Sequence, residues 1–129
     1  MTFREAVAGL QGNMRLIAAT IAFNTAGGTA DLGALAVGDV VMQVWAQVTT
    51  AFNSATTNVI TVGDGTTADK YLAAADITEG TPGVYPTGGK GPFAAETAAG
   101  TLRVTYTQTG TAATTGSAKV YALISDLPQ

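Results

Sequence analysis

The chain has 129 residues, of which only 12% are charged, carries a net charge of −3, and contains neither cysteine nor histidine. Its length suffices for one domain that buries about two-thirds of the surface exposed by the unfolded chain. The missing residue types exclude disulfides, thiolate metal sites and Ser-His-Asp or Cys-His catalysis. Typical soluble domains have about a quarter charged residues, so this neutral, Thr/Ala-rich surface predicts burial against other subunits. The six basic residues form no positive stripe, and we expect no nucleic-acid partner.

Residues 1–13 are predicted to form an N-terminal arm, ahead of a single domain over residues 14–129. Thr2 and Glu5 match a capping box, which predicts a short helix to about Leu10. Glycines limit its length, and one or two helical turns are marginal without a packing partner. Two interpretations stay open: a frayed terminus, or an arm that orders on a neighbouring subunit through Phe3 and Arg4.

No segment has the length and hydrophobicity of a signal peptide or a membrane span. Gln11, Asn13 and Arg15 interrupt the apolar residues that follow Arg4, so no signal-peptide core forms. The longest apolar run, residues 16–23, is much shorter than the ~20 residues that cross a bilayer. We therefore expect a soluble protein with no membrane partner.

The predicted fold is centred on residues 38–63, GDVVMQVWAQVTTAFNSATTNVITVG. The first half alternates with a period of two, which is typical of a strand, and one side of it carries Val40, Met42, Val44, Ala46 and Val48. A second β-rich run, residues 59–62, follows a small polar turn. Because a parallel crossover needs a dozen or more residues, the two runs are predicted to pair as an antiparallel hairpin.

The remaining segments extend the all-β pattern. Residues 14–23 are a predicted first strand and residues 24–33 a loop. Residues 65–91 show no clear alternation, with a helical turn expected within residues 71–77 and an open loop at residues 86–91. Residues 101–107 and 119–124 alternate and predict a second hairpin. Short strands without covering helices favour an all-β, jelly-roll-like antiparallel β-sandwich.

Three stretches resemble small virion proteins of tailed bacteriophages: GDVVMQVWAQVTTAFNSATTNVITVGD, YLAAADITEGTPGVY and AGTLRVTYTQTGTAATTGSAKVY. The resemblance covers residues 36–121 and brings no catalytic signature. It implies a jelly-roll-like capsid decoration (cement) protein, commonly a homotrimer that clamps the joints between major capsid protein subunits. The implied location is the outer capsid surface of the virion, and the host cytoplasm during assembly. Related sequences also look like tail or fibre components, so an alternative is a module that recognises a host surface.

The nine aromatic residues are the strongest candidates for core and interface positions. Trp45 falls on the polar side of the central strand, and we favour a second buried face of a sandwich over an exposed partner anchor. Tyr85 and Phe93 lie in or beside the long loop of residues 65–91, near prolines, and are the better interface candidates, although a satellite core beneath the loop is equally compatible. Three other aromatics are expected to fill the core: Phe23, Phe52 and Tyr106.

No sequence pattern predicts catalysis, metal binding or cofactor binding. Asp64, Asp69 and Asp76 suggest a calcium site, but they lack the spacing of an EF-hand, and solvated loop carboxylates explain them better. Residues 83–90 superficially resemble a phosphate-binding loop but lack its GK[ST] ending. We therefore expect no catalytic residues, no metal and no cofactor, and the protein is not predicted to be an enzyme.

Overall fold

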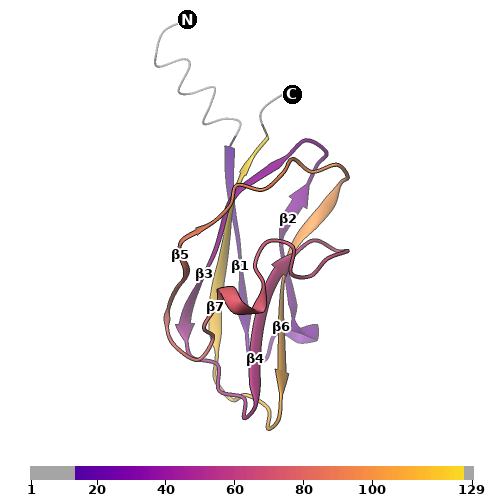
Figure 1. Cartoon of the computed structure of the whole chain (residues 1–129). Coiled ribbons are helices and arrows are strands. Elements are labelled where there is room, and N and C mark those ends of the chain that lie inside the picture. The colour runs from indigo at the N-terminus through magenta and orange to yellow at the C-terminus, as the bar shows by residue number, and fades with distance from the viewer. Residues whose placement is uncertain (1–13, 127–129) are drawn as a thin grey trace, which may run out of the picture.

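The computed structural model describes residues 14–126, and these form two antiparallel sheets packed face to face (Figure 1). The predicted helix at the capping box lies outside the described residues. Two short 3-10 turns, η1 (Ala26–Gly28) and η2 (Ala74–Asp76), interrupt the strands, and η2 confirms the helical turn expected there. The strands are β1 (Met14–Ala22), β2 (Thr29–Leu35), β3 (Val40–Thr50), β4 (Thr57–Gly63), β5 (Gly83–Lys90), β6 (Gly100–Thr109) and β7 (Ser117–Ser125).

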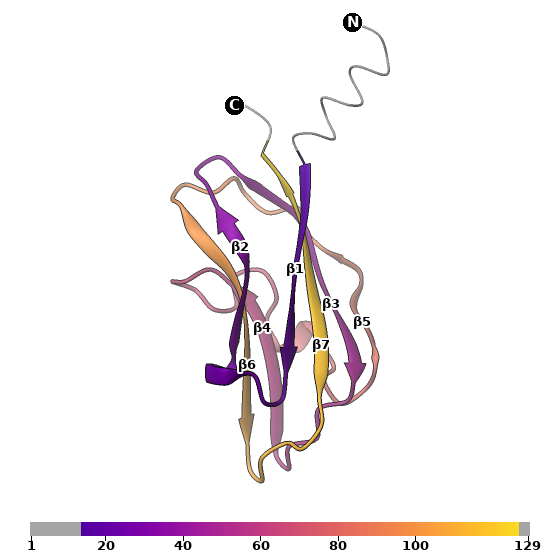
Figure 2. The ribbon, with the colours of Figure 1, turned by 180° about the vertical axis from the view of Figure 1, so that it is seen from behind.

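The strand order is that of a jelly roll. Sheet A has the order β1-β7-β3-β5 and sheet B the order β2-β6-β4, so the chain changes sheet at every connection between strands (Figure 2). A jelly roll has eight strands. The eighth position, beside β4, is taken by the irregular segment of residues 64–82, which makes a single bridge between Leu72 and Val62. The predicted all-β jelly-roll sandwich is confirmed.

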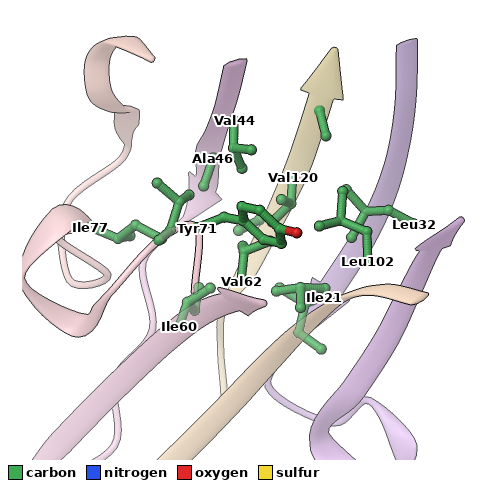
Figure 3. Packing of buried hydrophobic residues seen from close by; sticks show 14 of the residues in the cluster. Ile21, Leu32, Val44, Ala46, Ile60, Val62, Tyr71, Ile77, Leu102 and Val120 are labelled. Carbon is green, nitrogen blue, oxygen red and sulfur yellow. The ribbon is translucent and has the colours of Figure 1, made fainter. Parts of the chain in front are cut away.

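The core lies between the two sheets and is mostly aliphatic. Alternate residues of β3 and β7, such as Val44 and Val120, are fully buried, as the period-2 pattern predicts. Among the described residues, Tyr71 has the largest fully buried side chain. It reaches between the sheets from the irregular segment (Figure 3). Phe52 and Tyr106 are buried as expected, and Phe23 packs half-buried against the core. Each fully buried valine, leucine or isoleucine side chain contributes about 1.5–3 kcal/mol of transfer free energy.

Both predicted hairpins are wrong. β3 and β4 belong to different sheets, and so do β6 and β7. Their two connections cross the same end of the sandwich and bond to each other: Asn53 accepts hydrogen bonds from the amides of Thr114 and Thr115, at 2.8 and 3.0 Å. Alternation shows that a strand has one buried face, but it does not identify the neighbour with which the strand pairs.

Sheet edges account for the other corrections. Residues 29–33 were predicted as loop but begin β2, and residues 86–90, predicted as open loop, end β5; both strands lie at sheet edges. β5 contains Pro86, which lacks an amide hydrogen and is tolerated only at an edge or bulge, and residues 86–89 have no partner in β3.

A register shift between Val41 and Gln43 places Val41 in the core in place of Val40 and Met42.

Candidate assembly surface

The side of sheet A that faces away from sheet B carries apolar and aromatic side chains. Trp45 alternates with the buried residues Val44 and Ala46, so it points outward, and its cross-strand partner is Tyr121. The two rings stack with centroids 5.2 Å apart and planes 12° apart. The prediction of a buried second face for Trp45 is therefore wrong, because no further layer covers this side of the sheet among the described residues.

We call this side the outer face of sheet A and define it by Leu16, Ala18, Thr20, Gln43, Trp45, Gln47, Val84, Lys119, Tyr121 and Leu123. Leu16 and Val84 have exposed fractions of 58% and 45%, which is high for large aliphatic side chains. Lys119 is the single charged member, and its Nζ lies 5.5 Å from the ring centroid of Tyr121. An aromatic and aliphatic surface with so little charge has the composition of the centre of a protein interface.

A shallow groove of about 210 Å³ crosses this face where β3 meets β5. Trp45 and Val84 form its apolar walls, and Gln43 donates a hydrogen bond from its side-chain amide to the carbonyl of Gly88. Gly89 has a φ of +76°, and a Cβ there would lie 2.4 Å from Cγ of Gln43. Glycine is therefore required for the close approach that shapes the groove.

The predicted interface aromatics lie beside the core, not on the outer face of sheet A. Tyr85 is half-buried and donates a hydrogen bond from its hydroxyl to the carbonyl of Thr81, at 2.8 Å. Phe93 packs edge-on against Tyr71 with ring centroids 5.0 Å apart. Their role in an interface stays a prediction, and the predicted contacts of Phe3 and Arg4 lie outside the described residues.

A polar cavity of about 620 Å³ lies on the other side of the molecule, between residues 64–70 and residues 96–101. Glu96, which is buried, accepts hydrogen bonds from the hydroxyl of Tyr71 and from Nζ of Lys70, the latter at 3.0 Å. Hydrogen bonding to Glu96 raises the pKa of Lys70, and burial raises the pKa of Tyr71. Both groups are protonated at neutral pH even at their ordinary pKa values and act as donors to Glu96. Glu96 thereby anchors the loop that carries Lys70 and Tyr71 to the core.

The acidic residues considered for calcium have local structural roles. Asp64 accepts hydrogen bonds from the amides of Thr66 and Thr67, which lower its pKa. Asp76 lies 2.8 Å from Nζ of Lys90, and this contact lowers the pKa of Asp76. No group of three or more potential metal-ligating side chains occurs within residues 14–126. In the same range, no helix is long and apolar enough to cross a membrane.

No protein-family model matches the chain, and none of the curated proteins matches its sequence. Solved structures do match its fold, and two of them are phage capsids. A chain of the capsid asymmetric unit of cyanophage Pam1 superposes with a TM-score of 0.61 at 22% identity, covering 90% of this chain and 86% of that one. A chain of the acid-stable capsid of Helicobacter pylori bacteriophage KHP30 gives 0.66 at 18% identity, covering 90% and 89%. This chain shares its fold with both. At such identities the likeness establishes the fold alone.

Sequence reasoning found some members of the candidate surface and missed others. The alternation of Trp45 with Val44 was visible in the sequence, and a single tryptophan on a polar side was a usable signal. Leu16, Val84 and Leu123 were not singled out, because they join Trp45 only through pairing between strands that are distant in sequence. The groove depends on β5, which was predicted as loop for most of its length, residues 86–90.

Proposed function

We propose that the protein is a phage virion structural protein that binds the outer surface of the capsid as a decoration (cement) protein. The observation that carries the proposal is a fold shared with chains of two phage capsids over nine-tenths of this chain's length. The resemblance in residues 36–121 to small virion proteins supports the same role. The partner is the major capsid protein, and a homotrimer at the joints between its subunits is the proposed arrangement.

The outer face of sheet A is the proposed contact with the shell. It combines exposed aliphatic side chains, Leu16 and Val84, with the half-buried stack of Trp45 and Tyr121. Aromatic residues supply much of the binding energy in interfaces. A repetitive shell also strengthens weak individual contacts through multivalency, so a modest neutral surface is sufficient for stable attachment.

The test is binding to heads that lack the protein. Purified wild type and Val84→Asp are mixed with such heads, and the bound fraction is measured by co-sedimentation. We expect Val84→Asp to weaken binding at least about tenfold, because a buried unpaired carboxylate costs more than 1.4 kcal/mol. Thr107→Asp is the matched control, since it adds the same charge at an exposed position of sheet B. Equal binding of both variants, or no binding of the wild type, would contradict the proposal.

Recognition of a host surface by a tail or fibre component is the second candidate, and the polar cavity favours it. The cavity is lined by threonines and by paired charges of both signs, including Lys70 and Glu96. Such a lining matches a neutral ligand with many hydroxyls, such as a glycan. Signal on a glycan array or on host cells, together with no binding to heads, would favour this function over decoration.

A further inference from the structure

Lys119 differs from the other basic residues of the described range in its pairing. The chain has six basic residues, and all except Arg4 lie within residues 14–126. Four of these form ion pairs with nearby carboxylates, at nitrogen–oxygen distances between 2.6 and 3.0 Å: Arg15 with Asp39, Lys70 with Glu96, Lys90 with Asp76 and Arg103 with Asp31. Within the same range, no carboxylate lies at ion-pair distance from Lys119.

Lys119 lies inside the outer face of sheet A and not along its side edges. Its strand, β7, has β1 on one side and β3 and β5 on the other. The cross-strand neighbours of Lys119 are Thr20 and Gln47, and Val84 follows Gln47 in the same row. All three neighbours are exposed and uncharged. Because Trp45 belongs to the adjacent row, a partner surface that covers both Trp45 and Val84 also covers Lys119.

The ammonium group of Lys119 lies close to the aromatic stack. Its Nζ is 5.5 Å from the ring centroid of Tyr121, and this ring stacks on Trp45. A partner that buries the stack therefore also removes water from the ammonium group. The contact with an aromatic ring replaces only part of the lost hydration. A desolvated charge remains costly unless a group of opposite charge pairs with it.

The charge on this face is opposite in sign to that of the chain. The chain carries a net charge of −3, whereas the outer face of sheet A has one basic residue and no acidic residue. A single cation does not match a polyanion, because nucleic acids are bound by several lysines and arginines together. It matches one carboxylate on a partner surface that is otherwise apolar, as complementary interfaces place opposite charges against each other.

We propose that Lys119 forms an ion pair with an aspartate or glutamate side chain of the major capsid protein when the outer face of sheet A binds the shell. The inference rests on the proposed capsid function and specifies the chemistry of the partner surface. Apolar side chains of the shell cover Trp45 and Val84 around this pair. A surface without a carboxylate opposite Lys119 leaves the ammonium group unpaired and binds more weakly, so the pair provides specificity as well as affinity.

Carbodiimide cross-linking tests the pair directly. The reagent activates a carboxylate, and an amine in contact with it displaces the activating group to form an amide. Complexes of the unmodified protein with heads that lack it are treated, digested and analysed by mass spectrometry. We expect a peptide that joins Lys119 to an aspartate or glutamate of the major capsid protein. The pairs of Lys70 with Glu96 and Lys90 with Asp76, at 3.0 and 2.8 Å, are internal controls for the reaction.

Substitution of Lys119 provides a second test, because the sign of the effect depends on the partner. If a carboxylate faces Lys119, Lys119→Met leaves that carboxylate buried and unpaired, and we expect binding to heads to weaken at least about tenfold. Without such a carboxylate, the same change removes only the cost of desolvating the ammonium group, and binding becomes tighter. Lys119→Arg keeps the charge and should bind more tightly than Lys119→Met. Thr107→Asp is the matched control, since it lowers the net charge equally on sheet B.

Failure of the ion pair and failure of the capsid function give different results. Suppose that the wild type binds heads and Val84→Asp weakens this binding. Equal or tighter binding by Lys119→Met, or both internal cross-links without one from Lys119 to the shell, would then overturn the ion pair and leave the capsid function standing. No binding of the wild type to heads would overturn both proposals.

Discussion

The outer faces of the two sheets differ in composition although the sheets pack on one core. Sheet A presents Trp45, Tyr121 and exposed aliphatic side chains. Sheet B presents a row of paired threonines, Thr29, Thr105 and Thr61, beside the ion pair of Asp31 and Arg103. A threonine row with a solvated ion pair is typical of a face that remains in water, whereas the face of sheet A has the composition of an interface centre.

The sheets also differ in what completes them. Sheet B has three strands, and the irregular segment beside β4 is held by two buried carboxylates, Glu79 and Glu96. We therefore expect changes at these carboxylates to alter stability with little effect on partner binding. Changes on the outer face of sheet A should weaken partner binding with little effect on stability. Each prediction below tests one part of this division.

The largest expected loss of stability is at Glu96. Glu96→Ala leaves the buried hydroxyl of Tyr71 and the ammonium group of Lys70 without their closest acceptor. An unsatisfied buried polar group costs about 1–3 kcal/mol, and one bound to a charged partner costs more. We expect the free energy of unfolding to fall by about 2–4 kcal/mol in urea denaturation. Head binding by the folded fraction should remain at the wild-type level. A loss of binding without a loss of stability would show that Glu96 serves the contact with the head and not the fold.

Glu79 should make stability depend on pH. Burial raises the pKa of Glu79 in the folded protein above its ordinary value. At a pH below the unfolded pKa, both states are protonated and no cost arises. As the pH rises through the folded pKa, the unfolded state ionises more readily and wild-type stability falls.

Glu79→Gln tests this pH dependence, since glutamine retains an oxygen that accepts from the amide of Ile60. Melting temperatures of both proteins are compared between pH 4 and pH 7. We expect the variant to gain stability relative to the wild type as the pH rises, by less than the change at Glu96. Using the difference between the two proteins removes the contributions of Asp64 and Asp76, whose lowered pKa values give stability that is lost at acid pH. A difference that is constant with pH would show that Glu79 ionises normally.

The sequence predicted the interior of the fold better than its edges. Alternation located β3, β6 and β7, because central strands bury one complete face and need β-branched or aliphatic residues there. β2 and β5 were missed in whole or in part because edge strands pair on one side only and tolerate Gly33 and Pro86. The jelly roll itself was predicted, but the pairing partners of the strands were not, since no local pattern encodes which sheet a strand enters.

The candidate surface was harder to predict for a related reason. Trp45 and Tyr121 are 76 positions apart and become neighbours only through the register of β3 and β7. The sequence shows that Trp45 lies opposite the core-facing residues, but it does not show whether a further layer covers that side. Likewise, Glu79 and Glu96 look like ordinary loop carboxylates, and their burial depends on β4 and Tyr71.

The smallest expected effect is at the ion pair of sheet B. Asp31→Asn removes the charge that Arg103 contacts at 2.6 Å, but both side chains are well exposed to solvent. Exposed ion pairs contribute little, because water screens the attraction and the side chains lose entropy on pairing. We expect no measurable change in the urea midpoint or in head binding. Trp45→Ala is the matching change on the other sheet, and it should weaken head binding clearly. If Asp31→Asn reduced binding as much as Trp45→Ala, sheet B would share the contact with the shell and the assignment of one face to solvent and one to partners would be wrong.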